Sequence, residues 1–187
     1  MSDYMQLPAD LPVPEDDGAA DHLTDLTMPS VVLEATDGSS VDVGALGEGL
    51  TVLYIYPMTG TPGVELPEGW DEIPGARGCT PESCGFRDHF ADLKDVGADR
   101  VFGLSTQDLD TQRELAERLR LPYPLLADPE GTLGEALRLP AFEAGGKLRY
   151  KRITLIIISD VIDHVFYPIF PPNAHAIEVL GYLSDDC

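Results

Sequence analysis

The hydrophobic pattern of the chain predicts two kinds of strand. Residues 50–57 (LTVLYIYP) and 100–106 (RVFGLST) are almost wholly apolar and β-prone, which is typical of strands buried on both faces. Two further apolar stretches are each interrupted by a turn signal and therefore predict β-hairpins. These hairpins cover residues 30–43, with the turn at Asp37-Gly38, and residues 152–168.

Apolar residues at helical spacing predict four helices. Phe86, Phe90 and Leu93 stand at i, i+4 and i+7, which indicates one helix from about Thr80 to Val96. Gly97 is a suitable stop for that helix. The other three helices are predicted at residues 108–121, 130–139 and 173–183.

The order of these elements predicts an α/β fold. A strand–helix–strand unit followed by an antiparallel pair and a last helix is the thioredoxin-like arrangement, a central mixed β-sheet flanked by helices. The first hairpin is an N-terminal extension of that fold. With 187 residues and 43% hydrophobic content, we expect one compact domain over residues 23–187. Residues 1–22 are acidic and contain prolines, and we interpret them as a mobile tail or an arm.

Charge and composition exclude several classes of function. The chain has 33 acidic and 12 basic residues, a formal net charge of −21, and such a field repels nucleic acid and anionic membranes. No apolar run approaches the ~20 residues of a membrane span, and the acidic N-terminus is unlike a secretory signal. We expect a soluble cytoplasmic protein, a monomer or a homodimer, with no nucleic acid or membrane as partner. The acidity would also fit a high-salt setting.

Two of the three cysteines stand at the start of the helix predicted over residues 80–96. Cys79 lies where a Gly- and Pro-rich segment ends, and a helix N-terminus favours the thiolate over the thiol. Cys84 follows five positions later. In an intact helix, this spacing separates the Cα atoms by about 8–9 Å, whereas a disulfide usually needs less than ~7 Å. A Cys79–Cys84 bridge would therefore require the first turns to unwind.

Two other interpretations of the cysteines remain open at this point. Cys84 could be a small apolar residue packed on the sheet. Cys79, Cys84 and His89 could also bind a metal, although structural zinc sites need four ligands and usually place paired cysteines closer together. We favour redox chemistry, with no metal and no bound cofactor.

The segments YIYPMTGTPG and GCTPESCGFRDHFADL resemble the active-site region of peroxiredoxins, in particular the Q-type or bacterioferritin-comigratory group. The resemblance continues through FGLST, LPYPLLADPEGTLGEAL, RITLIII and PNAHAIEVL, and it covers roughly residues 27–184. It implies a thiol-dependent peroxidase that reduces hydrogen peroxide and organic hydroperoxides. By this resemblance, Cys79 is the peroxidatic nucleophile, Cys84 resolves it as an intramolecular disulfide, and thioredoxin or a similar dithiol reduces the product.

The resemblance also assigns three supporting residues. Pro57 matches a proline that shields the nucleophile, Thr61 a threonine near it, and Arg152 an arginine that stabilises the thiolate and binds the peroxide. Strand parity puts Arg152 on one side with Tyr150 and Thr154. It puts Lys147, Arg149 and Lys151 on the opposite side.

The sequence departs from the family pattern between Thr61 and Cys79. Residues 64–78 form an insertion, which we interpret as a cover over the pocket with Trp70 as its apolar anchor. Thr80 is expected to be a helix-cap or first-turn residue, Cys187 a frayed and unpaired thiol, and His89, His164 and His175 structural or exposed residues. The competing functions are a thiol–disulfide oxidoreductase, which lacks the expected Cys-x-x-Cys, and a redox-responsive binding protein on the same fold.

Overall fold

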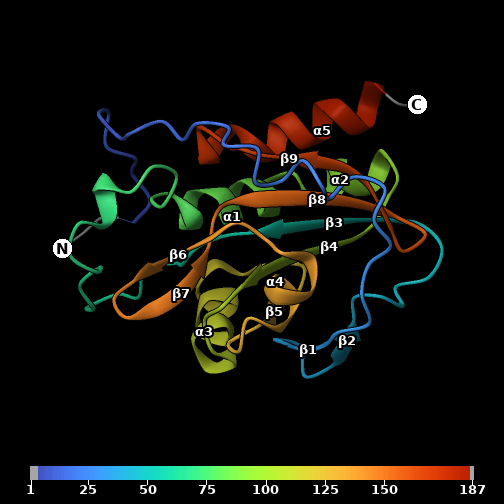
Figure 1. Cartoon of the computed structure of the whole chain (residues 1–187), viewed down its shortest axis with the longest axis horizontal. Coiled ribbons are helices and arrows are strands. Elements are labelled where there is room, and N and C mark those ends of the chain that lie inside the picture. The colour runs from blue at the N-terminus through green and yellow to red at the C-terminus, as the bar shows by residue number, and fades with distance from the viewer. Residues whose placement is uncertain (1–3, 186–187) are drawn as a thin grey trace.

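A mixed seven-stranded sheet forms the centre of the computed structural model, which describes residues 4–185 (Figure 1). The strand order is β2-β1-β5-β4-β3-β8-β9. Strand β4 runs parallel to β3 and β5, and the other pairs are antiparallel. The strands are β1 Val32–Ala35, β2 Ser40–Asp42, β3 Leu50–Ile55, β4 Ala98–Ser105, β5 Leu125–Ala127, β8 Ile153–Ile158 and β9 Val161–Phe166. This is the predicted α/β class with the N-terminal hairpin at one edge.

Side-chain alternation along the central strands divides the core into two clusters, one on each face of the sheet. Tyr54 of β3 contributes to a cluster with helices α1, α2, α3 and α5, whereas its neighbours Leu53 and Ile55 contribute to the other, with α4. The helices are α1 Cys79–Asp88, α2 Phe90–Asp95, α3 Leu109–Leu119, α4 Thr132–Leu137 and α5 His175–Asp185. Both faces of β3 are therefore covered, as its uninterrupted apolar sequence predicts.

The helix predicted from Thr80 to Val96 is wrong as a single element. The structure divides it into α1 and α2, because His89 leaves helical geometry with φ −103° and ψ 12°. Leu93 still reaches the core from α2, so the apolar spacing continues across the break. Gly97 does end the segment, and its positive φ of 106° explains the choice of glycine.

A second, two-stranded sheet was absent from the sequence-based prediction. Strands β6 (Ala141–Ala144) and β7 (Lys147–Tyr150) pair around Gly145 and Gly146, which both have positive φ, as a tight hairpin turn requires. This hairpin leads directly into Arg152, at the entrance to β8. Within the hairpin, Arg149 is buried, whereas Lys147 is exposed.

Residues 4–22 lie along the body of the protein as an extended arm. Tyr4 Oη donates hydrogen bonds to the carbonyls of Thr61 (3.2 Å) and Val64 (2.6 Å), and Asp17 forms an ion pair with Lys151. Among the described residues, no helix is long and apolar enough to cross a membrane. Cys187 lies outside the described residues.

Candidate active site

Cys79 is the first residue of α1, and its sulfur is buried at that helix end. Gly78 precedes it in the left-handed region with φ 108°, and a Cβ at Gly78 would lie 2.4 Å from the ring of Pro172. Only glycine therefore fits this close approach without displacement. The Cys79 side chain is 2% exposed, and its thiol faces the Ala76 carbonyl at 3.6 Å.

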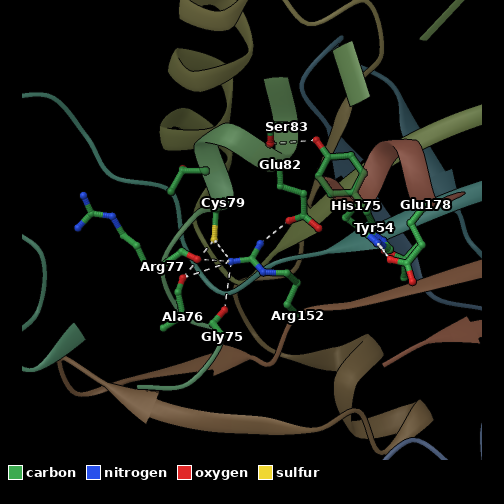
Figure 2. A network of polar contacts seen from close by, with 12 residues as sticks. Tyr54, Gly75, Ala76, Arg77, Cys79, Glu82, Ser83, Arg152, His175 and Glu178 are labelled. Carbon is green, nitrogen blue, oxygen red and sulfur yellow. Dashed lines mark hydrogen bonds and ion pairs between the residues drawn. The ribbon is translucent and has the colours of Figure 1, made fainter. Parts of the chain in front are cut away.

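The guanidinium of Arg152 makes the closest charged contact to Cys79 (Figure 2). Nη2 lies 3.2 Å from the Cys79 sulfur and also faces three carbonyl oxygens of the preceding turn, those of Gly75, Ala76 and Arg77, at 3.1 to 3.3 Å. These contacts fix the guanidinium against the loop that carries Cys79. Tyr150, Arg152 and Thr154 are all buried, but the prediction that they share one side of a strand is wrong. Tyr150 ends β7 and donates to Asp128, whereas Thr154 lies in β8 and contacts His175.

Glu82 is a site residue that the sequence analysis missed. Its Oε2 accepts a hydrogen bond from Arg152 Nη1, and both side chains are almost completely buried. A glutamate in the first turn of a helix is ordinarily explained by the helix dipole. The signal that could have identified it is its place one turn after Cys79, on the side of the helix that meets Arg152.

Burial and neighbouring charges together shift the pKa values of Cys79, Glu82 and Arg152. Burial raises the pKa of the Cys79 thiol, Arg152 acts to lower it, and Glu82 acts to raise it. Burial likewise raises the pKa of Glu82, with Arg152 opposing the rise. For Arg152, burial acts to lower the pKa, but Cys79 and Glu82 together raise it above its ordinary value. Arg152 is therefore always charged, and the Cys79 thiolate and the Glu82 carboxylate compete for this one cation.

A very small cavity lies beside Cys79. Its volume is about 10 Å³, close to the space that one water molecule needs. Tyr4 from the arm, Trp70 from the insertion and Met58 from the loop after β3 line it, and Thr80 does so from the first turn of α1. In this state a substrate reaches the sulfur only if one of these segments moves.

Neither of the two other predicted site residues, Pro57 and Thr61, lines this cavity. Pro57 is buried, two residues after the end of β3. Thr61 contributes to a larger neighbouring pocket instead. The loop between them is held by Gln107, whose Oε1 accepts from the Thr59 N–H at 3.0 Å.

Cys84 lies on the same helix in a different environment. Helix α1 is continuous from Cys79 to Asp88, and both cysteines are free thiols. The Cys84 sulfur lies 4.0 Å from the sulfur of Met5 in the arm. Burial raises the pKa of Cys84, and Arg87 acts to lower it. The pair is therefore held in the separated, helical arrangement.

The insertion packs on the small β6–β7 sheet. Trp70, in a short 3-10 helix at Trp70–Glu72, is 3% exposed, and its ring centroid lies 6.0 Å from that of Phe142. This contact ties the insertion to the hairpin that precedes Arg152.

Among the described residues, no histidine lines the cavity at Cys79. His175 is buried and contacts Thr154 Oγ1 at 2.8 Å and Glu178 at 2.9 Å, so it connects α5 to β8. His89 contacts Asp92 on the surface. Within residues 4–185, no group of three or more histidine, cysteine, aspartate or glutamate side chains is arranged to hold a metal ion.

Comparison with known proteins gives consistent matches. The Redoxin family model matches residues 24–180. A putative peroxiredoxin of Mycobacterium tuberculosis is 35% identical over 140 residues, which cover 74% of this chain and 80% of that protein. The chloroplastic peroxiredoxin Q of Triticum aestivum is 28% identical over 157 residues, 84% of this chain and 64% of that protein.

Solved structures agree with these sequence matches. The crystal structure of peroxidoxin BcpB from Mycobacterium tuberculosis has a TM-score of 0.69 and 31% identity, and the match covers 88% of this chain and 98% of that one. Peroxiredoxin Q of Xanthomonas campestris, at 20% identity, has a TM-score of 0.68 and covers 88% and 96% of the two chains. At that identity, the second match supports the fold alone.

Proposed function

The chain belongs to the Redoxin family as a peroxiredoxin of the Q type, and from that premise we propose that Cys79 and Cys84 carry out its thiol-dependent peroxidase reaction. Cys79 is the nucleophile and Cys84 resolves the oxidised form. The observation that carries the proposal is the 3.2 Å contact between Arg152 Nη2 and the Cys79 sulfur at the start of α1.

In the first step, the Cys79 thiolate attacks the terminal oxygen of a hydroperoxide. The sulfur–oxygen bond forms as the oxygen–oxygen bond breaks, Cys79 becomes a sulfenic acid, and water or an alcohol leaves after taking up a proton. Arg152 favours the thiolate and presents a fixed guanidinium N–H to the reacting oxygens. Because burial raises the thiol pKa, admitting water to the small cavity would also favour ionisation.

In the second step, the Cys84 thiol attacks the Cys79 sulfenic acid. A disulfide forms and one water molecule leaves. Both cysteines lie in an intact helix, at a separation too large for a bridge, so the first turns of α1 unwind in this step. Thioredoxin or a similar dithiol then reduces the disulfide and returns both thiols.

Pro57 and Thr61 act on access to the sulfur. Pro57 shields Cys79 from bulk water at the end of β3. Thr61 belongs to the loop that must move for a hydroperoxide to enter, and movement of that loop would bring its hydroxyl toward the sulfur. A cytoplasmic location and a monomeric or homodimeric state stay predictions from the sequence.

Intact mass with disulfide mapping tests the cycle. The protein is treated with one equivalent of hydrogen peroxide, as wild type, Cys84→Ser and Cys79→Ser. We expect wild type to lose two hydrogens at a mapped Cys79–Cys84 bridge, Cys84→Ser to accumulate a trappable sulfenic acid at Cys79, and Cys79→Ser to stay unreacted. Oxidation of Cys79 with Cys84 left as a free thiol would keep the nucleophile but assign resolution to another thiol. No rapid oxidation of Cys79 would refute the proposal.

A further inference from the structure

A larger pocket adjoins the active site, and a buried arginine lies in its wall. This side pocket has a volume of about 580 Å³, within the range of small-molecule binding sites. Its wall combines the loop after β3 (residues 58–61), part of the insertion (residues 64–67), the loop after β4 (residues 106–108) and β7 (residues 147–149). Both the insertion and the β6–β7 hairpin thus help to form it.

The side pocket shares a wall with the small cavity at Cys79. Met58, Gly60 and Leu66 line both spaces. These three residues therefore stand between an organic group in the side pocket and the cavity at Cys79. Met58 has a long, unbranched side chain that can change rotamer at low cost, so the shared wall can open.

Arg149 places an unneutralised cation in this pocket. Arg149 is 7% exposed, its Nε has no hydrogen-bond partner, and no ion pair joins its guanidinium to another residue among 4–185. Burial lowers the pKa of Arg149, and Cys79 acts to raise it. A buried cation without a partner is costly, unlike Arg152, which is paired with Glu82. Arg149 therefore carries an uncompensated desolvation cost in a pocket that adjoins the active site.

The other charged residues of the side pocket do not neutralise Arg149. Asp108 is exposed, and its carboxylate accepts the N–H of Thr111 at 2.8 Å, as the cap of α3. Glu65 and Lys147 are exposed side chains at the rim. The buried part of the pocket is therefore cationic in a protein whose net charge is −21, and an anion is the complementary ligand.

We propose that Arg149 binds the acid group of an organic hydroperoxide whose body occupies the side pocket and whose peroxide reaches Cys79. The inference rests on the proposed role of Cys79. A guanidinium binds a carboxylate through two parallel hydrogen bonds, which fixes orientation as well as position. The reaction is unchanged: the Cys79 thiolate takes the terminal oxygen, the oxygen–oxygen bond breaks, and the alkoxide takes a proton from water while the carboxylate stays ionised. Arg149 then determines the preference for organic hydroperoxides that carry an acid group.

A matched pair of substrates tests this role. The hydroperoxide of 4-isopropylbenzoic acid and that of its methyl ester differ only in the acid group, and kcat/KM is measured for both on each variant. The quantity compared is the ratio of acid to ester. We expect Arg149→Met to lower this ratio by about ten- to a hundredfold, the usual effect of losing a hydrogen bond to a charged group. Arg149→Lys should lower it less.

Arg113→Met is the matched control, since it removes one positive charge from the surface of α3, outside the side pocket. The ratio should not change in this control. An unchanged ratio in Arg149→Met would overturn the inference, including the case in which both substrates slow equally because Arg149 acts only on the thiolate. Equal losses in Arg113→Met and Arg149→Met would also overturn it, since net charge alone would then explain the effect.

Binding of the product separates this inference from the proposed function. Calorimetric titration of Cys79→Ser with the product alcohol, 4-(2-hydroxypropan-2-yl)benzoate, needs no turnover. We expect binding that Arg149→Met weakens at least tenfold. If wild type reduces no hydroperoxide but this binding is observed, the proposed function fails and the anion site stands. If the protein turns over peroxides but the alcohol binds equally well without Arg149, the anion site fails.

Discussion

Glu82 and Cys79 face the same guanidinium, that of Arg152, from successive turns of one helix. Arg152 Nη1 donates to the Glu82 carboxylate, and Nη2 points at the Cys79 sulfur (Figure 2). Neither member of the Glu82–Arg152 pair is more than 2% exposed. One buried cation therefore serves a permanent structural pair and the nucleophile, so stability and reactivity are linked through Arg152.

Arg152→Met should reduce both stability and activity. Removing the cation leaves Glu82 buried without a partner, which typically costs about 3–5 kcal/mol. Loss of the contact to the thiolate should lower kcat/KM for hydrogen peroxide by about ten- to a hundredfold. Urea unfolding and stopped-flow peroxide reduction measure the two effects. Arg152→Lys keeps the charge but cannot contact both anions with one planar group, so we expect an intermediate loss of activity.

The double variant Arg152→Met with Glu82→Leu separates the two roles. It removes the unpaired carboxylate, so most of the lost stability should return. Activity should not return, because the cation beside Cys79 is still absent. Recovery of both would mean that Arg152 supports catalysis only by neutralising Glu82.

Glu82→Gln should shift the ionisation of Cys79 to lower pH. The negative charge of Glu82 acts to raise the Cys79 pKa, and Arg152 acts to lower it. Removing that negative charge stabilises the thiolate, so its pKa falls. The rate of iodoacetamide alkylation against pH, in a Cys84→Ser background, measures the midpoint. Glu135→Gln is the control, because this exposed glutamate lies on α4, against the other face of the sheet. An upward shift, or equal midpoints in the two variants, would contradict the competition of two anions for Arg152.

The fold was predictable where one physical signal dominates. The apolar segments of residues 50–57 and 100–106 became the central strands β3 and β4, since strands buried on both faces leave little choice of residue. The break at His89 was not predictable, because Leu93 keeps its place in the helical spacing across it. Hairpin β6–β7 was missed because its charged residues conceal the alternation, although Gly145-Gly146 signals the turn.

The candidate site was predictable only in part, because some of its residues come from distant parts of the sequence. Cys79 and Cys84 were found from their place at a helix start, and Arg152 from a resemblance. Glu82 gains its significance from a partner 70 positions away, which spacing along one helix cannot reveal. The burial of Arg149 depends on how the hairpin and the insertion meet, and parity along one strand does not contain that information.

Formation of the Cys79–Cys84 disulfide should unfold the start of α1. Both residues lie in one intact helix, and their spacing is too long for a disulfide. We expect hydrogen exchange of residues 79–88 to accelerate after one equivalent of peroxide and to slow again on reduction. Peptides of α3 (Leu109–Leu119) serve as the internal control and should be unaffected. A mapped disulfide with unchanged exchange in residues 79–88 would show that the bridge forms without unwinding.

The insertion should behave as a cover anchored by Trp70. This residue is buried against Phe142 and lines the small cavity at Cys79, so its removal loosens a wall of the site. Trp70→Ala should lower stability by as much as about 3–5 kcal/mol and accelerate alkylation of Cys79. Trp70→Phe, which keeps an aromatic contact, should show smaller changes in both. Unchanged thermal stability together with unchanged peroxide kinetics in Trp70→Ala would refute the role of a cover.

Phe142→Ala shows whether the anchor acts through the hairpin. If Trp70 holds the insertion by packing on β6, the two alanine substitutions remove the same contact, and the double variant should lose less stability than the sum of the single losses. Alkylation of Cys79 should then be equally fast in Trp70→Ala and in the double variant. Additive losses would mean that the two rings contribute separately, and that the insertion covers Cys79 without support from the sheet that carries Arg149.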